Sequence, residues 1–585
     1  MIILYLEFHK NLGRDKRVKI IRINMKDLTV SEDQSLKYNG LGGRALTSKV
    51  IHDEVPPTCH PLGSFNKLVF ANGVLTGSGA SSADRYSIGA KSPLTGGIKE
   101  SNAGGISGLK LGRLGISSLI FEGVRDDFKI IHISKESITF DDATPILGKE
   151  LSEAADWLRD RYGKHIAVWL IGVAGEQKMN LAAIAGQDKE GLPTRFNGRG
   201  GLGAVAGSKG IKAIVLDDAG VEKNKPKDRE KFREAMKTYH KWLMETPGTA
   251  KVFPELGTAG LVKTTNALGA LPTRNFSTGS FELYENITGE KLRETILERG
   301  GEGNPTHACM PGCIIRCSNV YVNKAGKLVT SPLEYENIGL LGSNLGIGEL
   351  DAIAELNRLC NEYGVDTIET GAAIGVLMSQ GVLSFGDVEG AINAVKEIKA
   401  GSPLGRIIGG GAEIVGKLYG AYRVPTVKGQ SMPAYDPRAI KGLGVTYATS
   451  PMGADHTAGQ TIRAQIDHHS AEGQVKASKD AQETVTIFDS LGMCYFSGGA
   501  IQGRFDLIAD LITAYIGQKV TAEYLKETAL ETLKLEHQFN RRAGFTKAHD
   551  RLPEYFYTEM NEASKTVFDV PQEELELIGV EGNGR

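Results

Sequence analysis

Cysteine is scarce in this sequence, and so are long apolar runs and any excess of charge of one sign. Six cysteines in 585 residues are too few for the disulfide framework of a small secreted domain. A formal net charge of −2 gives no support to a nucleic-acid partner or an anionic membrane surface. No apolar run approaches the roughly 18 residues of a membrane span, and the opening MIILYLEFHK lacks the pattern of a secretory signal. We therefore expect a cytoplasmic protein with reduced thiols and no membrane span.

Glycine, in contrast, is abundant. The chain has 73 glycines in 585 residues, whereas an average protein has about 7%. They follow no fixed period, which excludes collagen, and the 41% of hydrophobic residues excludes a disordered low-complexity chain. Glycine used in this way indicates many tight turns, or backbone brought close to a large ligand.

The pattern of apolar residues changes along the chain and predicts an α+β protein. Strand-like segments such as RVKIIRINM and KLVFANGVL alternate with glycine turns in the first part, and KIIHISKESITF is predicted to form a hairpin. A charged linker and an amphipathic helix follow in KNKPKDREKFREAMKTYHKWLMETPG. Helical patterns dominate afterwards, such as GELDAIAELNRLCNEYG, which is predicted to end at Gly364 as a C-cap. We predict a β-rich domain at 1–219 and two mainly helical domains at 220–428 and 429–585.

Three of the six cysteines, Cys309, Cys313 and Cys317, lie in the short stretch ACMPGCIIRCSN. The Pro-Gly pair between the first two favours a turn, which would wrap the thiols around a shared group. Zinc needs four ligands, commonly in paired C-x2-C knuckles, and His307 is a further candidate nearby. A [4Fe–4S] cluster also needs four thiolates, typically three close in sequence and one remote.

The remote thiol would come from Cys494 in DSLGMCYF. Cys59 lies in a Pro-rich loop, and Cys360 lies on the apolar face of a predicted helix, where a cysteine is most often a small core residue. The spacing favours a cluster over zinc, and leaves incidental thiols as the third alternative.

The remote cysteine closes the motif D-x-x-G-M-C, which starts at Asp489, and the related motif N-x-x-G-V-D starts at Asn361. Together with the cysteine triplet, these motifs resemble the aldehyde:ferredoxin oxidoreductase family of tungsten enzymes. The resemblance covers nearly the whole chain. It is carried by six segments in order: NKLVFANGVLTGSGASSADRYSIGAKSPLTG, ESNAGG, RFNGRGGLGAVAGSKGIKAIVL, SPLEYENIGLLGSNLGI, PAYDPRAIKGLGVTYATS and FNRRAGFTKAHDRLPEYF.

The resemblance implies a bis-pterin cofactor of tungsten (or molybdenum) on the β-rich domain, and a [4Fe–4S] cluster held by the triplet and Cys494. Each D-x-x-G motif would hold one pterin, because a carboxylate accepts two hydrogen bonds from the guanine-like edge of a pterin. Asp489 fits this role. At the first motif Asn361 replaces the usual Asp, so the contact is weaker or uses Asp366; the alternative is a polar residue at a helix end. Further motif positions implied are Gly364, Gly492 and Met493.

The pterin phosphates need cations and backbone N–H groups. The segment GRGGLGAVAGSKG is of the kind that forms anion-binding nests, although alone it could serve any nucleotide. The resemblance implies a magnesium ion held partly by Asn102 and by the carbonyl of Phe196, and an arginine between pterin and cluster at Arg85. The other cofactor-binding positions implied here are Arg195, Gly198, Arg199, Gly200 and Gly201.

The family uses no protein side chain as a tungsten ligand, so the chain would contribute acid–base groups. The candidates are Glu336 or Glu334 in PLEYEN, and His456 in PMGADHTAG. The alternatives are a favourable charge at a helix N-terminus for the glutamates and a structural role for the histidine. The implied reaction is oxidation of an aldehyde with water to a carboxylic acid, with electrons leaving through the cluster to ferredoxin or another low-potential carrier.

Two departures from the family pattern bear on these expectations. The triplet is C-x3-C-x3-C, whereas better-known members have C-x2-C-x3-C, but four thiolates remain. The E-x-x-H motif through which iron bridges two subunits in some members is missing, and the corresponding helix offers Glu355-x-x-Arg358. A homodimer and separate electron-transfer subunits are both open. The rival functions are a low-potential reductase or the catalytic subunit of a larger complex in the same family, and a non-enzymatic, metal-stabilised binding protein.

Overall fold

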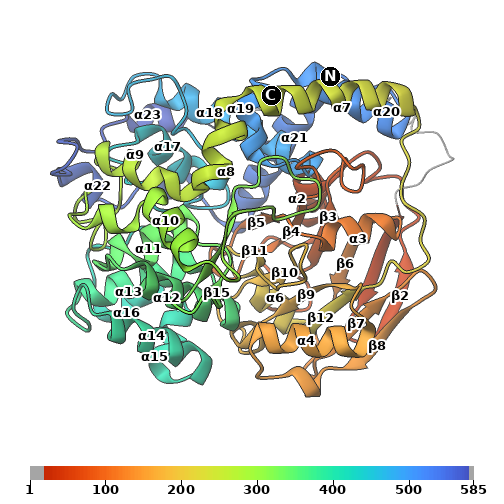
Figure 1. Ribbon diagram of the computed structural model, residues 1–585, viewed down its shortest axis with the longest axis horizontal. Helices are drawn as coiled ribbons and strands as arrows, with labels where there is room; N and C mark the ends of the chain where they lie inside the picture. The colour runs from red at the N-terminus through yellow and green to blue at the C-terminus, as the bar shows by residue number, and fades with distance from the viewer. Residues whose placement is uncertain (1–18, 579–585) are drawn as a thin grey trace.

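The computed structural model describes residues 19–578, and its β-rich part lies at the lower right of Figure 1. The strands of the first sheet are β1 (Lys19–Asn24), β2 (Thr29–Glu32), β3 (Leu68–Asn72), β4 (Tyr86–Lys91), β5 (Ile98–Ala103) and β6 (Ile116–Glu122). Their order is β2-β1-β6-β3-β4-β5, in which β1 and β6 run parallel and the other neighbours antiparallel. Every residue of β3 and β4 is buried, because both faces of this sheet are covered.

A second sheet packs on the first. Its strands are β7 (Lys129–Ile133), β8 (Ile138–Asp142), β9 (Ala167–Ile171), β10 (Ile184–Gly186), β11 (Arg195–Asn197) and β12 (Ile211–Leu216). Their order is β11-β10-β9-β12-β7-β8, and β7 and β12 form the parallel pair. The hairpin predicted in KIIHISKESITF is confirmed, since β7 pairs antiparallel with β8 and places Ile131 opposite Phe140.

Aromatic rings join the inner faces of the two sheets. The ring centroid of Trp169 on β9 lies 4.8 Å from that of Phe70 on β3 and 5.1 Å from that of Tyr86 on β4. Such rings bury about 150–250 Å² each, so they contribute strongly to the free energy of packing. The outer faces are covered by α2 (Gly43–Glu54) on the first sheet and α4 (Leu151–Tyr162) on the second.

The rest of the described chain is mainly helical, which confirms the predicted α+β class. Shorter helices of the β-rich part are α3 (Ser107–Arg113), α5 (Val173–Glu176) and α6 (Leu202–Ser208). The later helices are α7 (Arg229–Glu245), α8 (Phe253–Leu256), α9 (Leu261–Ala267), α10 (Gly289–Arg299), α11 (Tyr335–Leu341), α12 (Leu350–Tyr363), α13 (Thr367–Ser379), α14 (Val388–Ala400), α15 (Pro403–Gly409), α16 (Ala412–Tyr419), α17 (Lys441–Thr449), α18 (Gln474–Leu491), α19 (Gly498–Ile501), α20 (Phe505–Ile516), α21 (Ala522–Ala543), α22 (Tyr555–Thr558) and α23 (Gln572–Leu575). Two small sheets consist of β13 (Asn304–His307), β14 (Ser318–Val322) and β15 (Leu328–Thr330), and of β16 (Thr426–Val427) and β17 (Gln430–Ser431).

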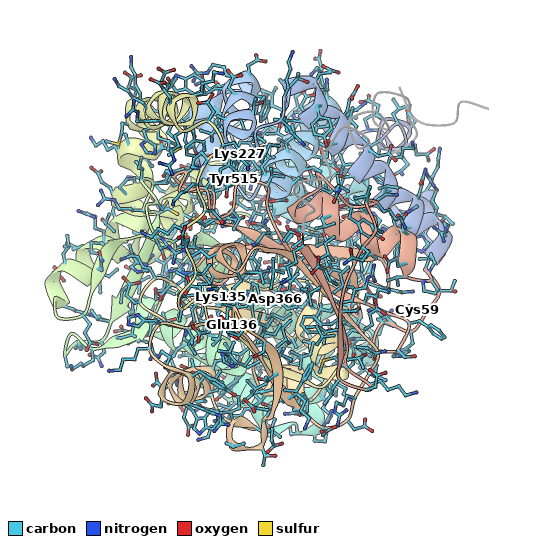
Figure 2. The ribbon with its side chains drawn as sticks, turned by 90° about the vertical axis from the view of Figure 1, so that its right-hand side faces the viewer. Cys59, Lys135, Glu136, Lys227, Asp366 and Tyr515 are labelled. Atoms are coloured by element: carbon cyan, nitrogen blue, oxygen red, sulfur yellow. The ribbon has the colours of Figure 1, made fainter. Side chains whose placement is uncertain are left out.

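The linker after β12 runs back to the C-terminal helices. The backbone N–H of Lys227 donates to the carbonyl of Tyr515 at 3.2 Å, and Figure 2 shows these two residues side by side. α7 then packs along α20 at the top of Figure 1, so it lies against the third predicted domain although it belongs to the second by sequence. The domain boundaries at 219 and 428 stay predictions. No helix within residues 19–578 combines the length and the apolar character needed to cross a membrane.

Candidate functional site

The loop between β13 and β14 brings Cys309, Cys313 and Cys317 to the C-terminal end of α18, where Cys494 lies. Burial and the neighbouring thiols raise the pKa of Cys309 to about 12. Burial, Glu334 and the same thiols raise the pKa of Cys317 well above its usual value. Because charge on each sulfur affects the others, the four predicted ligands share one buried space.

Ser82 contacts two of these thiol-bearing residues, and the sulfurs are not gathered as closely as the ligands of one zinc ion. The Ser82 carbonyl accepts a hydrogen bond from the N–H of Cys494 at 2.7 Å, and its hydroxyl lies 3.3 Å from Cys313 Sγ. Within the described part of the chain, no three cysteine sulfurs lie within 4.8 Å of one another, whereas thiolates around one zinc ion stand about 3.8 Å apart. The choice between a cluster and a zinc ion at these thiols stays a prediction at this point.

The other two cysteines lie outside this group. Cys360 is fully buried in α12, as expected of a core residue. Cys59 lies near the edge of the molecule, away from Asp366 at its centre (Figure 2). Cys494, whose charge affects Cys309 and Cys317, lies with the triplet, and its role as the fourth ligand stays a prediction.

Arg85 lies between the thiols and the second D-x-x-G motif. Burial lowers the pKa of its guanidinium, but the charges of Cys494, Cys309 and Asp489 outweigh burial and raise it. Its Nε donates to Asn102 Oδ1 and its Nη2 donates to the Asn102 carbonyl at 3.1 Å. Arg85 thus already bonds both oxygens of Asn102, which a magnesium ion would have to share, so the magnesium site stays a prediction.

Asp489 ends α18 inside a group of buried charges. Burial and the nearby Glu100 raise its pKa well above the usual value, against the effect of Arg44. Arg44 Nη1 stands 3.6 Å from Asp489 Oδ2, which is beyond hydrogen-bonding distance. Gly492 follows with a φ of +76° and ends the helix. A Cβ on Gly73 would overlap the backbone nitrogen of Gly492, so glycine at position 73 lets the β-rich part touch this motif.

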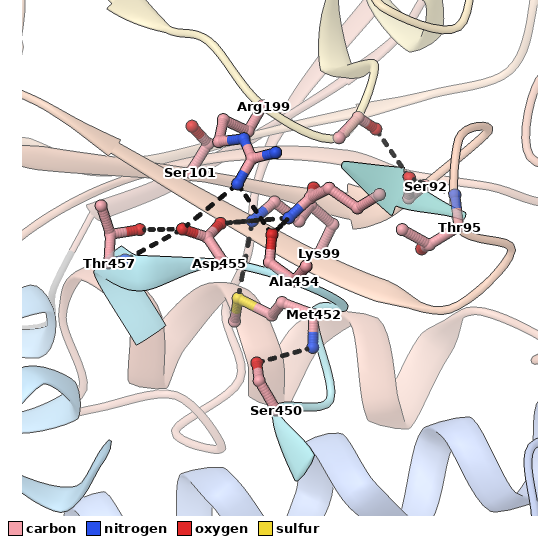
Figure 3. A network of polar contacts seen from close by, with 12 residues as sticks. Ser92, Thr95, Lys99, Ser101, Arg199, Ser450, Met452, Ala454, Asp455 and Thr457 are labelled. Carbon is pink, nitrogen blue, oxygen red and sulfur yellow. Dashed lines mark hydrogen bonds and ion pairs between the residues drawn. The ribbon is translucent and has the colours of Figure 1, made fainter. Parts of the chain in front are cut away.

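The glycine-rich segment leads into α6 and carries Arg199 into a buried polar network (Figure 3). Arg199 donates to Asp366 Oδ2 at 3.3 Å, to the Ala454 carbonyl at 2.8 Å and to the Ser431 carbonyl at 2.6 Å. Its guanidinium is therefore engaged with protein acceptors. The next two residues, Gly200 and Gly201, have φ of +82° and +74°, which favours glycine. A Cβ on Gly198 would make only an ordinary contact with Phe196, at 3.9 Å.

The same network fixes the segment that carries His456. Lys99 Nζ lies 2.6 Å from Asp455 Oδ2, and both side chains are almost fully buried. Burial raises the pKa of Asp455, but Lys99 and Arg199 outweigh it and hold that pKa below the usual range. The ionised Asp455 accepts the N–H of Thr457 at 3.0 Å and begins a short 3₁₀ turn at His456.

Glu336, in the first turn of α11, meets His456 in the interior. Glu336 Oε1 lies 3.4 Å from His456 Nε2, and Glu336 Oε2 accepts the N–H of Ala434 at 2.8 Å. Burial raises the pKa of Glu336. Glu336 Oε1 and His456 Nδ1 are buried without a hydrogen-bond partner in the described structure. A carboxyl and an imidazole with unused acceptor sites form a candidate acid–base pair.

Comparison with known proteins identifies the family. The N-terminal domain of aldehyde ferredoxin oxidoreductase matches residues 20–218, and domains 2 and 3 of the same family match residues 234–577. The chain belongs to this family. Membership makes the protein an oxidoreductase and confirms the resemblance read from its motifs.

Individual relatives agree with the family match. The chain is 32% identical over 572 residues to a tungsten-containing aldehyde ferredoxin oxidoreductase of Pyrococcus horikoshii, covering 92% of this chain and 91% of the relative. The corresponding protein of Thermococcus kodakarensis is 32% identical over 577 residues, covering 94% and 92%. The WOR-like subunit of an aliphatic sulfonate oxidoreductase of Pyrococcus furiosus is 27% identical over 571 residues, covering 90% and 85%.

One solved structure shares the fold. The active-site complex BamBC of benzoyl coenzyme A reductase, with bound 1,5-dienoyl-CoA, superimposes with a TM-score of 0.80 at 18% sequence identity. The match covers 95% of this chain and 93% of that chain. At this identity the likeness concerns the fold alone.

The two candidate glutamates of the α11 segment have different neighbours. Glu334 accepts a hydrogen bond from the Thr258 hydroxyl and from backbone in the first turn of α11, and its charge affects Cys317. Glu336 instead faces His456. Of the two, only Glu336 lies within reach of His456 in this member of the aldehyde ferredoxin oxidoreductase family, and the catalytic role of either glutamate stays a prediction.

The residues of the first D-x-x-G-type motif also have different neighbours. Asn361 donates to Thr330 Oγ1 at 3.2 Å and lines a small pocket between α4, α12 and β15. Asp366 joins the Arg199 network and caps α13 by accepting the N–H of Ile368 at 2.9 Å. Gly364, between them, ends α12 with a φ of +70°, as predicted. Whether Asn361 or Asp366 contacts a pterin stays a prediction.

Arg195 ends a hydrogen-bonded chain that sequence reasoning missed. Arg195 Nη2 lies 3.2 Å from His307 Nδ1, and His307 Nε2 lies 2.7 Å from Glu190 Oε2. Arginine only donates, so Nδ1 accepts and Nε2 carries the proton that it donates to Glu190. Asp188 lies close enough to complete a set of metal ligands, but a metal at Nε2 would need Nδ1 to donate instead. The group is a hydrogen-bonded chain, and His307 is not set up as a zinc ligand.

The remaining predicted positions have structural neighbours of their own. Met493 is buried in the core that also contains Cys313. Phe196, on β11, is half-buried against the outer core of the second sheet. Their cofactor contacts stay predictions.

Proposed function

We propose that this protein oxidises an aldehyde with water to the carboxylic acid in the cytoplasm, and passes the electrons through a [4Fe–4S] cluster to ferredoxin or a similar low-potential carrier. The observation that carries the proposal is the partly buried pair of Glu336 and His456, 3.4 Å apart and with unused polar atoms. The curated relatives named as tungsten-containing aldehyde ferredoxin oxidoreductases support the same reaction.

In this reaction the side chains of the protein transfer protons. Water adds its oxygen to the carbonyl carbon, the aldehyde C–H bond breaks, and two electrons and two protons leave. Glu336 accepts a proton from water or from the hydrated carbonyl. His456 positions the Glu336 carboxylate through Nε2, and it accepts or returns a proton at Nδ1. A bound tungsten bis-pterin centre would supply the two-electron acceptor, and a cluster held by the four cysteines would supply the one-electron path. The low-dielectric surroundings favour proton transfer between fixed partners over exchange with bulk water.

The chain's donor and acceptor groups suit these cofactors. Cys309, Cys313, Cys317 and Cys494 would hold the cluster, since their sulfurs share one buried space. Arg44 is too far from Asp489 to donate a hydrogen bond to it. Asp489 would therefore accept hydrogen bonds from the N–H edge of one pterin. The glycine-rich segment at 198–201 would approach the phosphates with its backbone.

Elemental analysis of anaerobically purified protein, together with aldehyde-dependent reduction of a low-potential dye, tests the proposal. About four irons and one tungsten per chain, with turnover of an aldehyde, are expected. Zinc alone without tungsten, molybdenum or iron would contradict both cofactors. The metals without turnover of any aldehyde would favour a second candidate, the catalytic subunit of a larger complex. The WOR-like relative supports that alternative.

We expect the acid limb of turnover to lie above pH 4.5, the usual pKa of a glutamate. Burial raises the pKa of Glu336, and only its ionised form accepts a proton. Turnover therefore falls as the pH drops through this raised pKa. Initial rates of the wild type measured between about pH 4 and pH 8 will locate the limb. A limb at or below 4.5 would contradict a proton-accepting role for the buried Glu336.

A further inference from the structure

A second carboxylate, Glu100, lies beside Asp489 with an unused oxygen. Glu100 belongs to β5, opposite Gly89 of β4, and its side chain is 5% exposed. Ser87 provides a hydrogen bond to it. Its Oε1 is buried and has no hydrogen-bond partner in the described structure. An acceptor left in this state costs free energy unless a ligand supplies the donor.

The charged groups around Glu100 do not donate a hydrogen bond to its free oxygen. Arg44 donates through Nε and Nη2 to Glu536 at 2.9 and 2.8 Å, and its Nη1 stands 3.6 Å from Asp489. Ser48 also donates to Glu536, at 2.7 Å. Glu536 is therefore satisfied, whereas Glu100 and Asp489 keep free acceptor positions.

The other nearby cations are committed elsewhere. Lys99, the neighbour of Glu100 on β5, reaches the opposite side of the strand and pairs with Asp455 at 2.6 Å. Arg85 donates to Asn102. Buried carboxyl oxygens with unused acceptor positions favour a ligand with several N–H donors.

We propose that Glu100 is a cofactor-binding residue that, together with Asp489, accepts hydrogen bonds from the N–H edge of one pterin. This inference rests on the proposed function, because it needs the pterin. The edge of a pterin carries a ring N–H and an amino group, so it offers more donors than one carboxylate accepts. The rigid β4–β5 ladder holds Glu100 in place and orients its free oxygen before the cofactor arrives.

Pterin retention in the purified holoenzyme tests the role of Glu100. The Glu100→Gln variant keeps the side-chain size but replaces one acceptor oxygen by a donor. We expect pterin and tungsten per chain to fall about tenfold after prolonged dialysis, because a charge-assisted hydrogen bond contributes roughly one order of magnitude in affinity. Pterin is measured by fluorescence after oxidative extraction and tungsten by elemental analysis. Iron per chain should remain unchanged, since the thiols are untouched.

Two further variants separate binding from folding. Glu100→Asp keeps the carboxylate and should restore part of the retained pterin. Asp436→Asn removes another fully buried carboxylate, paired with Arg438 at 2.6 Å, and should lower stability without loss of pterin per folded chain.

The outcomes distinguish this inference from the proposed function. Unchanged pterin in Glu100→Gln, or a loss of iron in parallel with pterin, overturns the role of Glu100. Pterin that is present in the wild type and lost in Glu100→Gln supports that role even where no aldehyde is oxidised. An active wild type whose Glu100→Gln variant retains its pterin leaves the proposed function standing and removes Glu100 from the site.

Discussion

Replacing Glu336 by Gln will lower kcat by about 10² to 10⁴ while tungsten and iron per chain stay at wild-type levels, since a positioned general base contributes a factor of this size. The amide keeps the volume of the carboxylate and its acceptor oxygen for the N–H of Ala434, which lies 2.8 Å from Glu336 Oε2. It loses the capacity to take up a proton beside His456. The measurement is steady-state turnover of an aldehyde with a low-potential dye, on protein of known metal content.

A matched substitution shows whether this loss is specific. Glu176 is another glutamate shielded from solvent, and it pairs with Lys212 in the β-rich part, away from His456. Glu176→Gln should change kcat by less than about twofold. If Glu336→Gln behaves like this control, Glu336 is not the proton acceptor. If Glu336→Gln loses its tungsten, its effect on turnover is structural and the acid–base role fails.

Local sequence patterns predicted the parts of the site that depend on neighbouring residues. The Pro-Gly turn placed three thiols in one loop, and Gly364 ends its helix in the left-handed conformation of a C-cap glycine. The alternating apolar pattern also predicted the β7–β8 hairpin. These features follow from backbone geometry over a few residues, so a single sequence is enough to recognise them.

The residues that sequence reasoning missed are joined by contacts between distant segments. Arg44 and Glu536 are separated by 492 positions, and no sequence pattern around either residue predicts its contact with the other. Glu100 lies in the quoted segment ESNAGG, but its charged neighbours come from α2 and α21, which pack over β5, and from Asp489 of α18. The sequence of β5, IKESNA, is mostly polar, so no local signal marked Glu100 as a buried residue.

The directions in which side chains leave a helix also could not be predicted from the sequence. Glu334 and Glu336 are two residues apart and were equal candidates, yet one lies near Cys317 and the other faces His456. The first caps α11 and the second lies within its first turn, so their side chains leave the helix in different directions. Sequence spacing placed both near the site, and only the three-dimensional structure separates their surroundings.

Replacing Arg44 by Met will destabilise the protein by about 3–5 kcal/mol, because removing one partner of a buried ion pair leaves charge without compensation. Arg44 is 1% exposed and faces Glu536, Asp489 and Glu100. Arg22 is the matched control. It also bonds three carboxylates, each at 2.7 Å, but its side chain is 22% exposed. Water and salt screen that group, so Arg22→Met should cost only about 1 kcal/mol. Denaturant midpoints of both variants, measured on protein with equal iron content, give the comparison. Equal losses would mean that burial of the Arg44 group does not set its contribution to stability.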